Sequence, residues 1–316
     1  LLLVRLNPAV EHKTRGNAAL AIHCDLDPAT ADSLAGELLA LAETDDERTN
    51  PGAVVAGCDP EDVPSELASF SRDAVRDHHE IGTARQLREQ LGYEATTRGN
   101  GRGLIGALAA VGAWAAFEEW TYECISYRER ERWGTERDVD RDSVFDAAAE
   151  SYPTVWDTID SVEERAVCVP RTPCPILHAV RGDGPEAVAA VAERIEGEPV
   201  AERARFVTNQ GTDAHLQSVD SPAAVASGRS YRLTADVTAD PETHEGGHVF
   251  VEVGEDGSAL PCVAFEPTKR FRDRVRGLRT GDRVTVCGEV ADGTLKLEKF
   301  ALRERVTTTK VTPDCP

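Results

Sequence analysis

The sequence predicts an α+β protein of several domains, because the pattern of its elements changes twice along the chain. Helices and strands mix up to residue 120, strands and helices alternate from 121 to 222, and short strands alone follow from 223 to 306. Alternation is typical of helices layered on a sheet, and runs of short strands are typical of barrels. A length of 316 residues suits two or three such domains.

The first part is predicted to be mixed α/β. Leu34, Leu38 and Leu41 share one face of a predicted helix. The apolar stretch from Leu104 to Phe117 is too short to span a bilayer and contains glycines, so we expect a buried helix. The expected strands are 1–6, 18–24 and 95–97, and the expected helices are about 30–43, 65–77, 83–91 and 104–117.

The middle part reads as strand, helix, strand, helix, strand, which predicts a ferredoxin-like α+β layer. Its clearest helix begins at Pro185, a residue favoured in a first helical turn, and has apolar residues on one face. The expected strands are 122–127, 176–180 and 204–208, and the expected helices are 143–150 and 185–196.

The last part predicts a small barrel of the oligonucleotide-binding type, with strands at 231–237, 248–253, 260–265, 283–290 and 295–302. Between the third and fourth strands, residues 269–279 hold six basic residues and one acid. A basic stripe with an aromatic ring can follow a phosphate backbone and stack on bases, although a solvated helix is the alternative. The candidate nucleic-acid-binding residues are Lys269, Arg270, Phe271, Arg272, Arg274 and Arg276.

A polar cluster from Thr208 to Leu216 follows the apolar strand that ends near Val207. Its carboxamides, carboxylate and imidazole surround one glycine, which suggests a binding site, with a capped turn as the alternative. We expect Asp213 and His215 to be catalytic, and the cluster to bind a ligand through Asn209, Gln210, Gly211, Thr212 and Asp213.

Two glycine-containing loops could bind phosphate groups. One precedes an apolar helix, so its N–H groups and the helix N-terminus could face an anion, although neither loop matches a complete nucleotide-binding motif. Turn formation is the alternative for both loops. The candidate phosphate-binding residues are Lys13, Arg15, Gly16 and Asn17 in the first loop and Gly101, Arg102 and Gly103 in the second.

Composition gives a habitat more than a partner. The net charge is −21 and the chain has only five lysines, at 13, 269, 296, 299 and 310, a balance that suggests a salt-rich cytoplasm. The eight cysteines form no Cys-x-x-Cys pair and there is no secretory leader, so we expect a reduced, cytosolic protein. The absence of Met suggests that the chain is cut at both ends.

Several segments together resemble the archaeal 2-agmatinylcytidine synthetases that modify isoleucine tRNA, and in particular a haloarchaeal member of that family. The resemblance covers essentially the whole chain in order. The segments that carry it are 3–8, 13–17, 101–107, 121–123, 180–182 and 208–216.

This resemblance implies an ATP-dependent ligase that replaces the C2 oxo group of the wobble cytidine of isoleucine tRNA with agmatine, so that the tRNA reads AUA. A carbonyl oxygen leaves poorly and must first be phosphorylated, which implies ATP and Mg²⁺. The resemblance also implies that 1–120 is the remainder of a kinase-like catalytic domain. It further implies that the cluster at 209–213 binds agmatine or cytosine and that the basic residues at 269–276 bind the tRNA. We expect Asp213 to hold the guanidinium of agmatine.

Two features of the family are not found in the sequence: an aspartate-rich first strand and a cysteine-rich zinc ribbon. Residues 307–316 are expected to begin that ribbon, with Cys315 as a first zinc ligand that only the full-length protein would complete, and the chain by itself is expected to be inactive. The alternatives are a noncatalytic RNA-binding protein with the same barrel and a polyamine ligase that uses no RNA.

Overall fold

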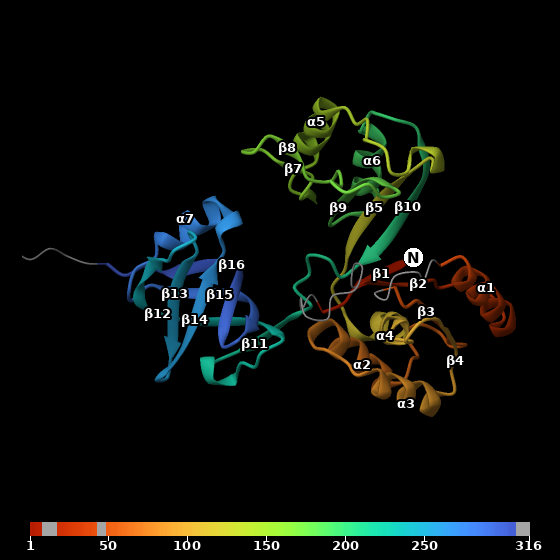
Figure 1. Cartoon of the computed structure of the whole chain (residues 1–316), viewed down its shortest axis with the longest axis horizontal. Coiled ribbons are helices and arrows are strands. Elements are labelled where there is room, and N and C mark those ends of the chain that lie inside the picture. Colours follow the sequence, from red (N-terminus) through yellow and green to blue (C-terminus); the bar gives the residue numbers. More distant parts are fainter. Residues whose placement is uncertain (8–17, 43–48, 308–316) are drawn as a thin grey trace, which may run out of the picture. The chain divides into compact units, whose positions relative to one another are not determined.

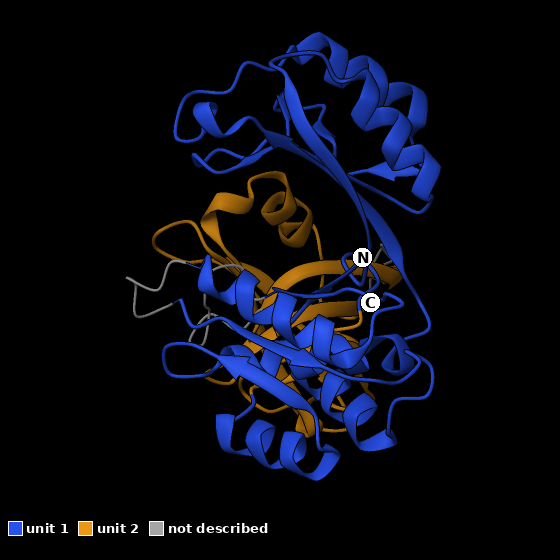
Figure 2. Cartoon of the chain, turned by 90° about the vertical axis from the view of Figure 1, so that its right-hand side faces the viewer, with its two compact units in different colours: residues 1–6, 14–74, 79–213 blue, residues 7–13, 75–78, 214–316 orange. Residues whose placement is uncertain are grey.

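The structure is a computed structural model that describes residues 1–7, 18–42 and 49–307. The chain forms two compact units: one holds most of the first 213 residues, and the other begins its main part at Ala214 (Figure 2). The predicted boundary at 223 therefore lies inside the second unit.

A six-stranded sheet forms the centre of the first unit, in the order β2-β1-β10-β5-β9-β6 (Figure 1). β1 runs parallel to β10, with Leu3 opposite Thr208, and the other neighbours are antiparallel. Strands predicted for two separate domains thus lie in one sheet. The bounds are β1 Leu2–Arg5, β2 Ala18–Ala21, β5 Thr121–Arg128, β6 Val155–Trp156, β9 Ile176–Gly182 and β10 Val200–Thr208.

Beside β1 and β2 lies a helical core built around the predicted apolar helix. This helix, α4 (Gly103–Ala116), is largely buried and packs with α2 (Ser65–Arg76) and α3 (Ile81–Leu91). None of the helices in the described ranges is long and apolar enough to cross a membrane. An antiparallel pair of strands, β3 (Gly52–Val55) and β4 (Glu94–Thr97), packs on α4. Strand β3 was not predicted from the sequence.

Helix α1 (Pro28–Ala40) forms where it was expected, capped by Asp27, whose carboxylate accepts the N–H of Thr30 at 3.0 Å. Its predicted apolar face is, however, not buried: Leu34, Leu38 and Leu41 are 44%, 61% and 81% exposed. The buried residue of this helix is Leu39, which the predicted stripe left out.

The part of the sheet formed by β5, β9 and β6 packs against α5 (Arg141–Ser151) and α6 (Pro185–Arg194), the two helices predicted for this region (Figure 1). A small hairpin of β7 (Ile159–Asp160) and β8 (Arg165–Ala166), which was not predicted, precedes β9. A buried ion pair fixes the loop after β5: Arg128 Nε donates to Glu198 Oε1 at 2.6 Å, and Glu198 also accepts the N–H of Asp138 at 3.0 Å.

The second unit contains a closed barrel, which confirms the prediction of five strands for this part of the chain. β12 pairs with both β13 and β15, and β14 and β16 complete the ring, while β11 (Leu216–Val219) lies outside it beside β12. A single apolar cluster fills the interior. The bounds are β12 Arg229–Thr243, β13 Val249–Glu255, β14 Ser258–Ala264, β15 Arg283–Ala291 and β16 Thr294–Glu304.

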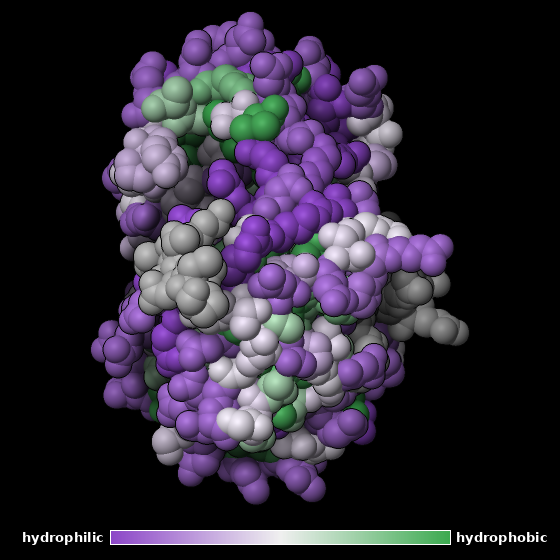
Figure 3. Space-filling model, turned by 90° about the vertical axis from the view of Figure 1, so that its left-hand side faces the viewer, coloured by the Kyte–Doolittle hydropathy of each residue, from purple (hydrophilic) through white to green (hydrophobic). Residues whose placement is uncertain are grey.

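Much of the surface is hydrophilic. Hydrophilic residues predominate on the face that Figure 3 shows, with small hydrophobic areas between them. The seven cysteines in the described ranges are free thiols.

Candidate active site

The predicted polar cluster forms a tight turn directly after β10, at the C-terminal end of this central strand of the six-stranded sheet. Thr121, the first residue of β5, donates to the carbonyl of Gln210 at 2.6 Å, and Thr212 donates to the carbonyl of Asn209 at 2.9 Å. The N–H of Gln210 reaches the Thr208 hydroxyl at 3.2 Å. The turn is therefore held by its own side chains and by the neighbouring strand.

Asn209 holds the turn to β1. Its Oδ1 accepts the N–H of Arg5 at 2.7 Å and its Nδ2 donates to the carbonyl of Arg5 at 3.0 Å. The side-chain amide therefore bonds to the backbone of β1 as the backbone of a neighbouring strand would. The side chain is buried, and these hydrogen bonds are made to the backbone. The structure thus gives Asn209 a positioning role, whereas its predicted contact with agmatine or cytosine stays a prediction.

A charged cluster that the sequence analysis did not single out lies on the same sheet. The buried carboxylate of Glu123 accepts from Arg5 Nη2 at 3.0 Å on one oxygen and from Arg181 Nε at 3.0 Å on the other. Its side chain is 1% exposed, whereas those of Arg5 and Arg181 are 32% and 29% exposed. Two cations on one buried anion leave a net positive charge with guanidinium groups open to solvent, a suitable environment for a phosphate.

Trp156 packs against the glycine of the turn. Gly211 has a φ of +85°, and a Cβ there would lie 2.7 Å from the Trp156 ring, so only glycine fits. The indole N–H donates to Asp183 at 2.9 Å, which fixes the ring. Asp213, which follows, has a φ of +63°, a left-handed conformation that aspartate adopts more readily than most residues.

The second glycine loop has a packing role. A Cβ on Gly103 would lie 2.3 Å from the Gly52 nitrogen, so the start of α4 touches β3 too closely for any side chain. The N–H of Asn100 and that of Arg102 already bond to the side chains of Asn50 and Asn100. Phosphate binding by Gly101, Arg102 and Gly103 stays a prediction, and Arg102 alone among these three offers a cation.

The start of α4 nevertheless lies near the same end of β1 as the polar turn. Gly106 is so close to β1 and β2 that a Cβ there would lie 3.3 Å from Leu6 and 3.3 Å from Ala19. Because the backbone of Arg5 bonds to Asn209, the first turns of α4 and the polar turn meet the same end of β1.

The other predicted residues differ in their surroundings. His215 Nε2 lies 3.1 Å from Glu298 Oε2 on β16, so its imidazole already has an acidic partner, and its catalytic role stays a prediction. The division between the two units falls between Asp213 and Ala214. Lys13, Arg15, Gly16, Asn17 and Cys315 lie outside the described residues.

The predicted basic stripe forms helix α7 (Arg270–Arg276) between β14 and β15 of the barrel. Val275 anchors it in the core, and Phe271 meets Phe300 with ring centroids 5.7 Å apart, so that ring is partly used in packing. Arg272 is mostly buried and donates to the Gly247 carbonyl.

The solvent side of this helix keeps its charge. Lys269, Arg270 and Arg274 are exposed. Because Arg270 and Arg274 are four residues apart, they share one face of α7. Arg276 pairs with Asp273 of the same helix. Contact with tRNA by these cations, and stacking by Phe271, stay predictions.

The first unit thus has partly exposed guanidiniums next to a polar turn, and the second has a closed barrel with a cationic helix. These features favour an enzyme that acts on a nucleic acid. Comparison with known proteins makes this class specific. Residues 101–215 match the family model described as the TiaS FLD domain.

The chain is 49% identical to TiaS of Haloquadratum walsbyi, a 2-agmatinylcytidine synthetase of isoleucine tRNA, over all of this chain and 77% of that protein. It is 42% identical to the enzyme of the same name from Methanosarcina acetivorans, over all of this chain and 75% of that protein. The chain therefore belongs to the TiaS family of tRNA 2-agmatinylcytidine synthetases.

Solved structures agree. The crystal structure of TiaS in complex with its isoleucine tRNA and ATP matches with a TM-score of 0.88 at 41% identity, over 96% of this chain and 72% of that one. A ZRD-deleted mutant of TiaS in complex with agmatine matches with a TM-score of 0.84 at 37% identity, over 98% of this chain and 82% of that one.

Proposed function

We propose that this chain acts as a tRNA-modifying ligase that uses ATP to replace the C2 oxo group of the wobble cytidine of isoleucine tRNA with agmatine. One observation carries the proposal: the likeness to TiaS enzymes extends over the whole chain, at 49% identity to one of them, and includes the polar turn. The ligands named in the related crystal structures, an isoleucine tRNA, ATP and agmatine, are the three substrates of this reaction.

The domain labels are part of this proposal. We assign the strands and helices of 121–213 to a ferredoxin-like layer, the part before them to the remainder of a kinase-like domain, and the barrel to an oligonucleotide-binding fold. A closed five-stranded barrel with a helix between its third and fourth strands supports the last label. A cytosolic location belongs to the same proposal.

Agmatine is proposed to bind at the turn that follows β10. Its guanidinium needs a carboxylate, and Asp213 is held there in a fixed left-handed backbone conformation. The Trp156 ring, fixed by Asp183, lies against Gly211 two residues earlier and offers an aromatic surface to a cation. The Gln210 side chain remains the candidate for contact with the cytosine, because the N–H groups of Gln210 and Thr212 and the Thr212 hydroxyl already donate within the turn.

The phosphates of ATP are proposed to bind where Arg5 and Arg181 flank the buried Glu123. The carboxylate orients the two guanidiniums and offsets their mutual repulsion, and their exposed sides can receive phosphate oxygens. Arg102 at the start of α4 is a further candidate. Transfer of a phosphoryl group to the cytosine oxygen would convert it to a leaving group that the agmatine amine can displace.

The metals that the family implies have no support among the described residues. These residues contain no group of three or more His, Cys, Asp or Glu side chains that could hold a metal ion. We therefore assign no Mg²⁺ ligand among these residues and derive no step through Mg²⁺. Cys315, the candidate zinc ligand, lies outside the described residues.

Three binding titrations on the wild-type chain separate this function from its alternatives. A ligase of this type is expected to bind ATP, agmatine and isoleucine tRNA. An RNA-binding protein without catalysis would bind tRNA and ignore ATP and agmatine, and a polyamine ligase would bind agmatine and ATP with no affinity for tRNA. Either of the last two patterns would refute the proposal.

A further inference from the structure

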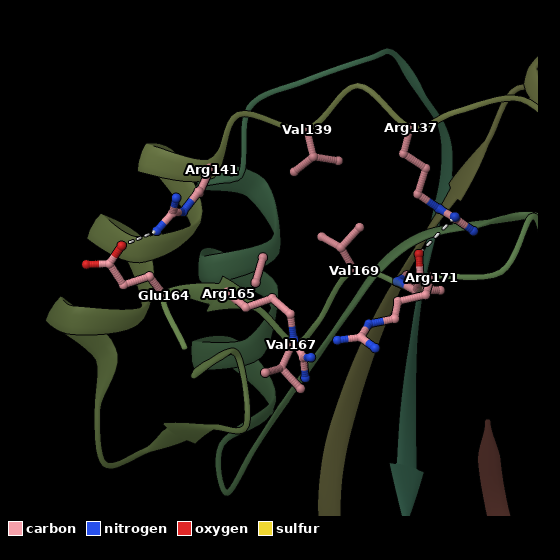
Figure 4. Close-up of a pocket in the computed structure, with 10 residues that line it drawn as sticks. Arg137, Val139, Arg141, Glu164, Arg165, Val167, Val169 and Arg171 are labelled. Carbon is pink, nitrogen blue, oxygen red and sulfur yellow. Dashed lines mark hydrogen bonds and ion pairs between the residues drawn. The ribbon is translucent and has the colours of Figure 1, made fainter. Parts of the chain in front are cut away.

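A cavity lined by residues between Arg137 and Arg171 of the first unit has no role in the function described above. It has a volume of about 710 Å³ and lies beside the start of α5, the β7–β8 hairpin and the segment that leads to β9 (Figure 4). None of the ten residues that line it is a predicted site residue.

The lining of this cavity is strongly basic for so acidic a chain. Four arginines and one glutamate line it, whereas the whole chain has a net charge of −21. The glutamate, Glu164, pairs with Arg141 at 3.4 Å, and both side chains are exposed, which makes a weak pair. Three arginines are thus left without a carboxylate partner among the lining residues.

Arg137 is held by neutral groups. It donates to the backbone carbonyls of Pro170, Thr172 and Ile176, each at 2.9 Å, so its hydrogen bonds are satisfied but its charge is not neutralised by them. The guanidinium therefore fixes the segment before β9 and leaves a positive potential at the cavity.

Arg165 and Arg171 are the free cations of the lining. Both are exposed, and neither side chain makes a hydrogen bond or ion pair with any residue in the described part of the chain. In Figure 4 the two side chains extend toward one another beside Val167. Two guanidiniums that converge without an anion repel each other unless a ligand lies between them, and each presents a planar set of donors suited to phosphate oxygens.

The remaining wall is apolar. Val139, Val167 and Val169 line it, and Val167 is 39% exposed although it is a β-branched apolar residue. The lining includes no Asn, Gln, Ser or Thr side chain, so it offers no neutral donor and acceptor pair to read the edge of a base. Cations at the rim and an apolar wall fit a sugar-phosphate group bound without regard to sequence.

We propose that this cavity, with Arg165 and Arg171 at its rim, binds a backbone phosphate of the tRNA at a nucleotide other than the reacting cytidine. A strand of RNA is favoured over a free nucleotide because the rim is open and the lining has no aromatic ring on which a base could stack. The inference rests on the proposed function, which supplies tRNA as the substrate. Its effect would be to hold the tRNA in register while the wobble base is extruded.

The test compares the affinity of the wild-type chain for isoleucine tRNA with that of Arg165→Ala/Arg171→Ala over a series of KCl concentrations. Loss of two phosphate contacts should weaken binding about tenfold at the lowest salt and reduce the slope of log K against log salt by about 1.4 to 1.8. Arg194→Ala/Arg205→Ala is the matched control, because it removes two exposed arginines of the same unit that are already paired with Glu150 and Glu186. Arg165→Lys/Arg171→Lys keeps the charges and should keep the slope.

Each outcome decides. Equal affinity and slope for the alanine variant and its control would overturn the inference and leave the proposed function standing. Weakened binding of ATP with unchanged binding of tRNA would identify a nucleotide site and also overturn it. A wild-type chain that binds no tRNA would refute the proposed function itself, together with this inference.

Discussion

Replacement of Gly211 by alanine tests whether the polar turn and Trp156 form one unit. The new Cβ would lie 2.7 Å from the Trp156 ring, on a backbone with a φ of +85°. A left-handed alanine costs about 1–2 kcal/mol, and an overpacked contact costs about 1–3 kcal/mol more. Moving the ring instead would break its 2.9 Å hydrogen bond to Asp183, which costs about 1 kcal/mol.

Gly134→Ala is the matched control, because Gly134 has a φ of +81° in the same unit with nothing within 4 Å of the new Cβ. Urea denaturation followed by circular dichroism should show Gly211→Ala to be less stable than the control by about 1–3 kcal/mol. Titration with agmatine should show weaker binding for Gly211→Ala alone. Equal stability and equal agmatine affinity of the two variants would refute the coupling of the turn to the ring.

Three further predictions concern stability. His178 is buried without a hydrogen-bond partner, and burial lowers its pKa to about 4, whereas its pKa in the unfolded state is near 6.5. The unfolded state therefore binds the proton more tightly, and the free energy of unfolding should fall as pH drops from about 6.5 to 4. A His178→Leu variant whose free energy of unfolding, measured with urea, falls with pH as steeply as that of the wild type would contradict this. The hydrogen bond from Arg128 lowers the pKa of the Glu198 carboxylate. The stability that this carboxylate contributes is therefore present above its unfolded pKa and is lost as pH falls through its lower folded pKa. Glu198→Gln should reduce the free energy of unfolding by about 3–5 kcal/mol at neutral pH, and a reduction below about 1 kcal/mol would show that the buried pair contributes little. The melting temperature should rise with KCl, because a net charge of −21 repels itself in dilute buffer, and a flat melting curve would argue against a salt-adapted surface.

Local signals in the sequence predicted local structure well. Pro185 and its apolar stripe predicted a helix over 185–196, and the structure has it at Pro185–Arg194. The barrel strands were also located, because neighbouring strands there pair mostly through short connections and alternate clearly between buried and exposed residues. The helix α1 was located but not its buried face, since the leucines that share a stripe are exposed.

Long-range pairing could not be predicted in the same way. Leu3 lies opposite Thr208, so the first strand joins a sheet in which most other members follow more than a hundred residues later, and periodicity contains no information about such partners. The Glu123 cluster was missed for the same reason, because Arg5, Glu123 and Arg181 are distant in sequence. One signal was available, because each of these three residues lies in a segment that carried the family resemblance, at 3–8, 121–123 and 180–182.

The central claim is that the turn after β10 binds agmatine through Asp213. Calorimetric titration of agmatine should show saturable binding to the wild-type chain and a rise in Kd of about ten- to a hundredfold for Asp213→Asn, as expected for loss of a charge-assisted pair of about 1.5–3 kcal/mol. Asp256→Asn is the matched control, because Asp256 is also left-handed, with a φ of +51°, and lies in a hairpin of the barrel. Agmatine affinity that is the same in the wild type and in Asp213→Asn would contradict the claim.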